Sequence, residues 1–190
     1  LKNCPSREVL HGLGGLVEPP DVPVQFRHLE TTRAMLLMSD KIPKVYARGP
    51  GQTVDNFEMI RIAYGLTEEE FRSRPCVTTI INTNSPLQLD VPMAEGLIAM
   101  AAHGQVNVIT PFTLAGAMAP VSIAGALVLQ HAEAMFGLVL TQIVRPGVPA
   151  VYGGFTSNVD MKTGAPAFGT PEYAKAAQAS GQLARRISAP

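Results

Sequence analysis

Residues 106–152 read VNVITPFTLAGAMAPVSIAGALVLQHAEAMFGLVLTQIVRPGVPAVY, and this stretch decides the fold class. Residues 106–110 predict a strand, 121–144 predict a long helix, and 149–152 predict a second strand. The helix is expected to end at 145–147, because the Arg-Pro-Gly sequence there stops helices. A strand, a helix and a second strand in this order are typical of parallel α/β proteins.

The same alternation continues toward the N-terminus. Thr53 is a plausible N-cap of a helix, and Thr67 with Glu70 forms a capping-box pattern at the start of a short one. Further helices are predicted at 6–16, 27–38, 92–103 and, after Thr170 and Pro171, near the C-terminus, and further strands at 42–47 and 76–81. Few strand residues alternate in polarity, which is typical of parallel strands covered by helices.

Two α/β architectures fit about four such strands: a doubly wound open sheet and part of a barrel. No G-x-G-x-x-G sequence follows a predicted strand, which weakens the nucleotide-binding, doubly wound version. A (β/α)8 barrel needs eight strand–helix units and typically about 250 residues. The 190 residues would supply about half of these units. We expect residues 1–190 to be a single fragment of such a domain, because both ends look cut from a longer chain.

Composition excludes several classes of partner. Hydrophobic residues make up 46% and charged residues 16%, so a sizeable core is expected. Lys plus Arg equals Asp plus Glu at 15 each, and no basic patch argues for nucleic acid or an anionic membrane surface. Residues 106–129 lack charge, but prolines and glycines interrupt them, which favours a strand, a loop and a buried helix over a membrane span. Cys4 and Cys76 predict reduced, inert thiols in a cytoplasmic protein.

Working residues of parallel α/β proteins lie on loops at the carboxyl ends of strands. The expected loops are 48–51, 82–85, 110–113 and 152–158, which are rich in Asn, Thr, Ser, Gly and aromatic residues. No nucleophile–base set and no metal-ligand spacing occurs in them, so no metal site is predicted. The four histidines, His11, His28, His103 and His131, fall in or at the ends of predicted helices and are expected to be structural. The H-x-E sequence at 131–133 lies inside a long helix without a following P-C-x-x-C, so a zinc deaminase is rejected.

Aromatic rings in these loops suggest a cation site. Phe112, Tyr152 and Phe155 are candidates to bind a quaternary ammonium group through their ring faces, and the alternative is that they pack in the core. Gly153 and Gly154 either let a bulky partner approach the backbone or form a plain tight turn. Asp160 either complements a cation or caps a local turn.

Several long stretches in the same order resemble the trimethylamine methyltransferase (MttB) superfamily. They are 82–87 (NTNSPL), 110–121 (TPFTLAGAMAPV), 124–127 (AGAL), 142–147 (QIVRPG), 151–161 (VYGGFTSNVDM) and 163–172 (TGAPAFGTPE). The resemblance is dense from about residue 76 to the end. It implies a (β/α)8 barrel on a chain more than twice this length, of which these residues are the central part.

The resemblance also implies an activity. Members move a methyl group from a methylated amine to a corrinoid carried by a small partner protein. No pyrrolysine occurs in these residues, and the resemblance is closer to the branch without it, whose members take quaternary amines such as glycine betaine. Attack by a reduced corrinoid on the methyl carbon releases a neutral amine, so no general acid is required.

Residue roles follow from loop position, and no catalytic residue is assigned. We expect Phe112, Tyr152 and Phe155 to hold the ammonium group, with Asn82, Phe112 and Tyr152 converging at the barrel mouth. Residues expected to orient the rest of the substrate are Asn82, Asn84, Thr110 and Thr156. Gly153 and Gly154 are expected to leave room for the corrinoid.

Two alternatives remain open: a zinc-dependent corrinoid methyltransferase, and a degenerate member that binds a ligand or partner without catalysis. A half barrel would expose unpaired strand edges and a cut apolar surface. We therefore expect the fragment alone to be inactive and to self-associate as a homo-oligomer.

Overall fold

The computed structural model describes residues 12–14 and 19–190. These form two compact units. Unit 1 takes the described part of Leu1–Ile80 with Val91–Asn107 and Val144–Pro149. Unit 2 takes Ile81–Asp90, Val108–Ile143 and Ala150–Pro190.

Five strands form the main sheet, and their order in the sheet follows their order in the chain. They are β1 (Gly12–Gly14), β2 (Ile42–Lys44), β3 (Thr78–Ile81), β4 (Val106–Ile109) and β6 (Ala150–Tyr152), in the order β1-β2-β3-β4-β6. The β1–β2 and β2–β3 pairs are parallel. A (β/α)8 barrel adds its strands in sequence order, whereas a doubly wound sheet reverses direction at a switch point. The expectation of a parallel α/β fold of the partial-barrel type is therefore confirmed.

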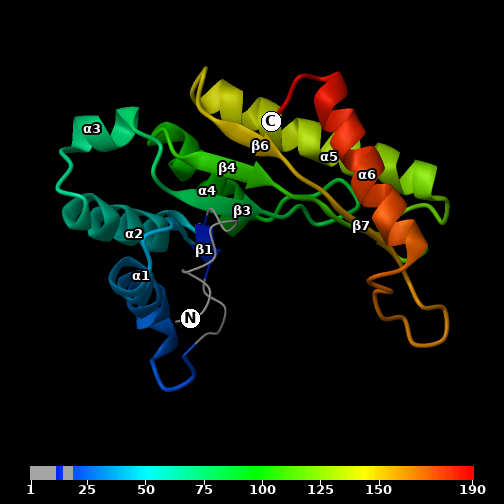
Figure 1. Cartoon of the computed structure of the whole chain (residues 1–190), viewed down its shortest axis with the longest axis horizontal. Helices are drawn as coiled ribbons and strands as arrows, with labels where there is room; N and C mark the ends of the chain where they lie inside the picture. The colour runs from blue at the N-terminus through cyan, green and yellow to red at the C-terminus, as the bar shows by residue number, and fades with distance from the viewer. Residues whose placement is uncertain (1–11, 15–18) are drawn as a thin grey trace. The chain divides into compact units, whose positions relative to one another are not determined.

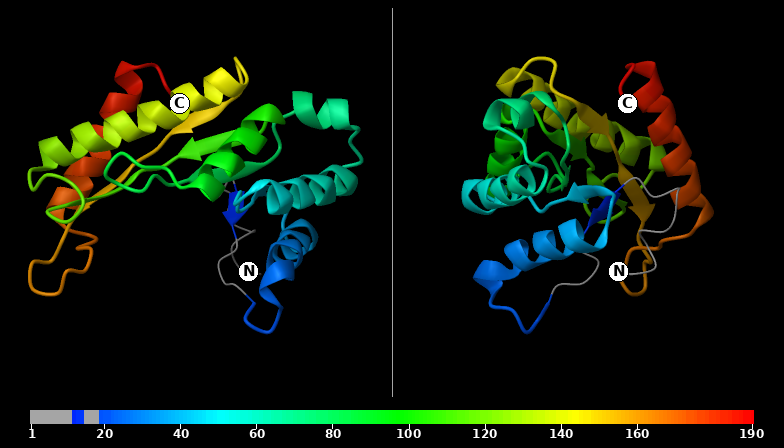
Figure 2. Two further views of the ribbon diagram at one scale, coloured as in Figure 1. Left: turned by 180° about the vertical axis from the view of Figure 1, so that it is seen from behind. Right: turned by 60° about the vertical axis from the view of Figure 1, so that its left-hand side comes forward.

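Unit 1 packs four helices on its part of the sheet: α1 (Arg27–Met38), α2 (Pro50–Ala63), α3 (Glu68–Ser73) and α4 (Val91–Ala102), with a short 3-10 turn, η1 (Val24–Phe26), before α1. Figure 2 shows α1 lying beside α2, and these two helices contact each other, as do α2 and α4. Their buried apolar residues meet those of the segments just before β3 and just after β2 in one core that includes Met35, Val45, Phe57, Ile60, Phe71, Val77 and Met100. Gly96 of α4 lies directly against the backbone of Ala47.

Unit 2 contains two helices and a second, two-stranded sheet. The helices are α5 (Ile123–Val144) and α6 (Pro171–Arg186), and the strands are β5 (Phe112–Ala115) and β7 (Phe155–Asn158), which pair in parallel. Figure 1 shows α6 crossing β7, and the two contact each other. Thr170 caps α6 by accepting a hydrogen bond from the Tyr173 N–H, and Pro171 takes the first helical position, as predicted.

Three expectations for local structure were wrong. The expected loops at 110–113 and 152–158 run into strands β5 and β7, because each strand finds its partner more than forty residues away along the chain. Residues 12–14 form β1 rather than part of a helix at 6–16, and the remainder of that helix, with Cys4 and His11, lies outside the described residues. Helix α2 starts at Pro50 instead of after Thr53, because proline presets the backbone angle of a first helical residue.

Helix α5 is long and apolar enough, by length and composition, to cross a membrane. Its buried face nevertheless carries Gln130 and Glu133, whose side chains form hydrogen bonds within unit 2. Buried polar groups with protein partners are typical of a core helix in a globular domain. The strand β4, the loop-and-strand segment and α5 together occupy the uncharged stretch 106–129, as the sequence suggested.

The capping box at the start of α3 allows a first prediction. Thr67 accepts a hydrogen bond from the Glu70 N–H, and the Glu70 carboxylate accepts one from the Thr67 N–H at 2.8 Å. Thr67→Ala removes one half of this exchange and is expected to lower the free energy of unfolding by about 1 kcal/mol. Urea unfolding followed by circular dichroism measures the loss. Thr67→Ser keeps the hydroxyl and should restore most of it, so equal losses in both variants would contradict the capping role.

Candidate functional site

All nine predicted site residues lie in unit 2, at or just after the carboxyl ends of β3, β4 and β6. Burial alternates residue by residue along these strands, because successive side chains of a strand point to opposite sides. The alternation continues into the segments that follow β3 and β4. Side chains at five of the predicted positions are partly or fully exposed, and we call their side the open face: Asn82, Asn84, Thr110, Phe112 and Phe155.

Two stacked rings dominate the open face. Phe112 and Phe155 are the first paired residues of β5 and β7, so they stand side by side. Their ring centroids lie 5.3 Å apart with an interplanar angle of 15°. The structure therefore brings together two of the three aromatic residues that the sequence selected for a cation.

Two further rings, which sequence reasoning missed, complete an aromatic cluster. Phe168 meets the Phe155 ring edge-on at 5.2 Å, and Tyr173 lies 5.6 Å from Phe155. Phe155 is thus bordered by three rings, whereas Phe155 is the only ring neighbour of Phe112 among the described residues. Phe112 and Phe155 are both only partly buried. Phe168 is 54% exposed and extends the cluster toward solvent.

Tyr152 and Thr156 point the other way, toward α5. Tyr152 is 7% exposed, and its hydroxyl lies 3.1 Å from His131 Nδ1. It also accepts a long hydrogen bond of 3.5 Å from the Gln130 amide. Burial raises the pKa of Tyr152 by disfavouring the phenolate, so the hydroxyl keeps its proton at neutral pH. The assignment of Tyr152 to the substrate stays a prediction.

Gln130 is the centre of this buried network, and sequence reasoning did not select it. It is completely buried, accepts a hydrogen bond of 2.6 Å from Thr156 Oγ1, and donates one of 2.5 Å to Ser180 Oγ on α6. One side chain of α5 therefore links β6, β7 and α6. A network whose members are all paired rigidifies the elements it joins.

Gly153 and Gly154 have packing reasons to lack a side chain. A Cβ at Gly153 would come within 2.8 Å of the Ile109 carbonyl oxygen, and one at Gly154 within 2.2 Å of the Gln130 amide nitrogen. The Gly153 N–H donates to that same carbonyl at 2.7 Å. Close packing within the chain thus explains why both positions lack a side chain. Their expected role of leaving room for a corrinoid stays a prediction.

Other polar candidates have structural partners. Asp160 accepts hydrogen bonds from the Lys162 and Thr163 N–H groups at 2.7 and 3.2 Å, which supports its reading as the cap of a local turn. His103, just after α4, forms a side-chain hydrogen bond with the Ala99 carbonyl of that helix. Burial raises the pKa of the Cys76 thiol. No group of three or more His, Cys, Asp or Glu side chains is placed to hold a metal ion in the part of the chain that the structure describes.

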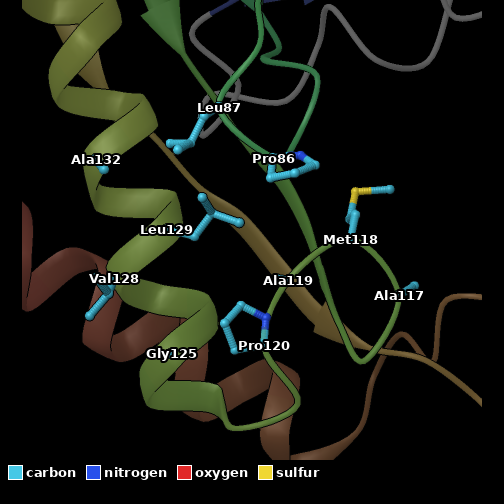
Figure 3. Close-up of a pocket in the computed structure, with 10 residues that line it drawn as sticks. All are labelled: Pro86, Leu87, Ala117, Met118, Ala119, Pro120, Gly125, Val128, Leu129 and Ala132. Carbon is cyan, nitrogen blue, oxygen red and sulfur yellow. The ribbon is translucent and has the colours of Figure 1, made fainter.

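An open apolar hollow of about 530 Å³ lies next to the loop after β3 (Figure 3). Its walls come from that loop, from the loop after β5 and from α5, and include Pro86, Leu87, Met118, Pro120, Val128 and Leu129. Nearly all of this surface is hydrocarbon. It offers an apolar contact area whose walls include two residues of the loop that also carries Asn82 and Asn84.

Comparison with known proteins decides the family. A sequence model of the trimethylamine methyltransferase (MTTB) family matches residues 1–190. The chain belongs to this family. The resemblance noted from the stretches between residues 82 and 172 is therefore confirmed, and it extends over the whole chain.

Relatives within the trimethylamine methyltransferase family carry names that specify methylated amines. The chain is 36% identical to a glycine betaine methyltransferase from Desulfitobacterium hafniense over 95% of its own length and 38% of the relative's. It is 34% identical to the trimethylamine methyltransferase MttB of Methanosarcina barkeri over 74% of its own length and 28% of that protein's length. A proline betaine:corrinoid methyltransferase from Eubacterium limosum is 29% identical over 62% of the chain and 24% of that protein. The chain thus spans well under half the length of these family members.

Proposed function

We propose that the chain is the central part of a longer (β/α)8-barrel enzyme that transfers a methyl group from a quaternary amine to the corrinoid of a partner protein. Three observations support this. The chain belongs to a methyltransferase family, its strands follow one another in sequence order, and it matches 38% of the length of a glycine betaine methyltransferase. In this proposal residues 1–190 are one continuous piece of a single barrel domain.

The observation that carries the proposal is the stacked pair of Phe112 and Phe155 on the open face. A quaternary ammonium group has no N–H to donate, so it is recognised by the negative faces of aromatic rings. Phe112, which stacks on Phe155 at the end of the aromatic cluster, is the proposed contact for the cation. Asn82, Asn84 and Thr110 lie on the same open face and offer uncharged groups to the remainder of the substrate.

The chemistry asks little of this chain in terms of acid or base. When the C–N bond breaks, its electron pair stays on nitrogen and a neutral tertiary amine leaves, so no proton has to be supplied. The reduced corrinoid, when its partner protein presents it, supplies the nucleophile that takes the methyl group. The protein's own residues hold the cation, orient the methyl carbon and exclude water.

Tyr152 and Thr156 contribute by their attachment to Gln130 in this proposal. Their hydroxyls fix β6 and β7 against α5, which sets the position of Phe155 between them. The backbone at Gly153 and Gly154 is the proposed point of closest approach for the corrinoid. The proposed partners are a methylated amine and a corrinoid protein, in a cytoplasmic homo-oligomer that binds neither nucleic acid nor a membrane.

The test is methyl transfer by the full-length protein, offered glycine betaine, proline betaine or trimethylamine together with a competent corrinoid partner. Phe112→Leu keeps an apolar side chain but removes the ring, so kcat/KM for a quaternary amine should fall about tenfold. Phe112→Tyr retains the ring and should keep most of the activity. Phe136→Leu, an exposed phenylalanine on α5, is the matched control and should be neutral.

If the full-length wild-type protein demethylates none of the quaternary amines offered, the proposal is refuted. Isothermal titration of the same amines then tests the remaining possibility. Binding without methyl transfer would indicate a family member that binds its ligand but does not catalyse the reaction. Equal activity of Phe112→Leu and Phe136→Leu would contradict the cation site while leaving the methyl transfer itself in place.

A further inference from the structure

The carboxylate of Glu133 is buried inside unit 2, where three donors surround it. Glu133 lies on α5 and is 2% exposed. One oxygen accepts hydrogen bonds from the Thr83 hydroxyl and, at 2.7 Å, from the Ser85 hydroxyl. The other accepts from the Leu87 N–H at 2.8 Å. All three donors belong to the loop that follows β3.

A buried carboxylate destabilises the fold unless its oxygens accept enough hydrogen bonds. Moving a carboxylate out of water is strongly unfavourable without hydrogen bonds to replace those it loses. Here both oxygens are occupied by the same loop, 46 to 50 residues away in the sequence. The side chain therefore acts as a tether between α5 and that loop.

The hydrogen bonds to Glu133 fix the side of the loop that faces α5, and so determine which side chains lie on its opposite side. Thr83 is buried against α5, whereas its neighbours Asn82 and Asn84 are exposed on the open face. The backbone of Asn84 pairs with that of Gln88 in both directions, at 2.8 and 3.2 Å. The Asn84 side-chain oxygen accepts from the Asp90 N–H at 3.0 Å, which closes the loop on itself.

We propose that Glu133 is a positioning residue, which holds the loop after β3 so that Asn82 and Asn84 face the substrate. The inference rests on the proposed function, because it assigns those two asparagines to the amine. Glu133 is not a catalytic residue, since both of its oxygens are engaged by the loop. Its effect on the reaction passes through the position of Asn82 and Asn84.

Two substitutions of Glu133 in the full-length protein separate positioning from charge. Glu133→Ala leaves three donors without an acceptor, so KM for the quaternary amine should rise about tenfold, with kcat changed less than about threefold. Glu133→Gln keeps the shape of the side chain. Its oxygen can accept from the Leu87 N–H, and the two hydroxyls can rotate to accept from its NH2 group, so KM should rise less than about threefold.

A structural readout accompanies the kinetics. Hydrogen exchange of the peptide covering residues 82–90 should be faster in Glu133→Ala than in the wild type and close to wild type in Glu133→Gln. Thr141→Ala is the control, since Thr141 is buried on the same helix face but bonds only the Gly137 carbonyl of its own helix. It should change neither the exchange of residues 82–90 nor KM. If Glu133→Ala does not fold, Ser85→Ala weakens the tether from the loop side and should show the same effects at smaller size.

The results that overturn the inference differ from those that overturn the proposed function. Unchanged exchange of residues 82–90 in Glu133→Ala and Ser85→Ala would show that no tether exists. A loss of kcat in Glu133→Gln as large as in Glu133→Ala, with normal exchange, would assign the carboxylate to the chemistry instead. Faster exchange of residues 82–90 in Glu133→Ala with an unchanged KM would show that the position of this loop does not affect binding of the amine. An inactive wild type refutes the methyl transfer, while the exchange data still decide whether the tether exists.

Discussion

Gly96→Ala is expected to destabilise unit 1 by about 3 kcal/mol or more. A methyl group at this position would lie 2.0 Å from the Ala47 carbonyl oxygen and 2.6 Å from its carbonyl carbon. The obstacle is backbone, so it cannot move aside as the end of a flexible side chain can. Helix α4 would have to shift away from the segment after β2, which opens the core that contains Met100. Urea unfolding followed by circular dichroism measures the loss.

Gly51→Ala is the matched control for this substitution. Gly51 also lies within a helix, α2, and a Cβ there would have no atom within 4 Å. Alanine is the better helix former, so the control should leave stability unchanged or raise it by up to about 1 kcal/mol. Similar unfolding midpoints for the two variants would refute the close contact between α4 and Ala47.

Gly154→Ala is expected to damage the site itself. The added methyl group would lie 2.2 Å from the amide nitrogen of Gln130 and 2.3 Å from its Cδ. Gln130 must then leave its position, and Thr156, Ser180 and Tyr152 lose their common partner. Loss of such buried hydrogen bonds should lower the free energy of unfolding by about 2 kcal/mol. If methyl transfer depends on the position of Phe155, kcat/KM should fall about tenfold or more in the same variant.

A double-mutant cycle identifies the cause of this effect. If the clash with Gln130 is responsible, Gly154→Ala combined with Gln130→Ala should cost less than the sum of the two single changes, by about 1 kcal/mol. Gly181→Ala, on α6, is the control, because its added methyl group would meet only the end of Arg185 at 3.6 Å. Strict additivity of Gly154→Ala and Gln130→Ala would mean that Gly154 is required for another reason.

The order of strands and helices could be predicted from sequence because it depends on local signals. Apolar spacing located α1 at 27–38, and the capping residues Thr67 and Thr170 marked two helix starts correctly. Strands β5 and β7 escaped because each is four residues long and pairs only with the other. Neither has a hydrophobic alternation of its own, and pairing over such a distance leaves no local trace.

The strand ends that carry the candidate residues could be predicted from the sequence, but the direction of each side chain could not. Parallel strands bring their carboxyl ends to one edge, so the loops at residues 82, 110 and 152 were correctly expected there. Which side chains face outward depends on single-residue alternation, and this sends Tyr152 and Thr156 to α5 instead of the open face. A usable signal was nevertheless present, since Gln130 and Glu133 are polar residues three positions apart in a mostly apolar helix.

That spacing has a consequence for how the site meets its ligand. Residues three apart lie on one side of a helix, so a single rigid rod holds both the loop after β3, through Glu133, and β7, through Gln130. The distance between Asn82 and Asn84 on one side and Phe112 and Phe155 on the other therefore depends on the spacing of Gln130 and Glu133 along α5. It is already set when the chain folds. At the proposed site a ligand would not have to order these side chains on binding, so its affinity would not be reduced by that loss of conformational entropy.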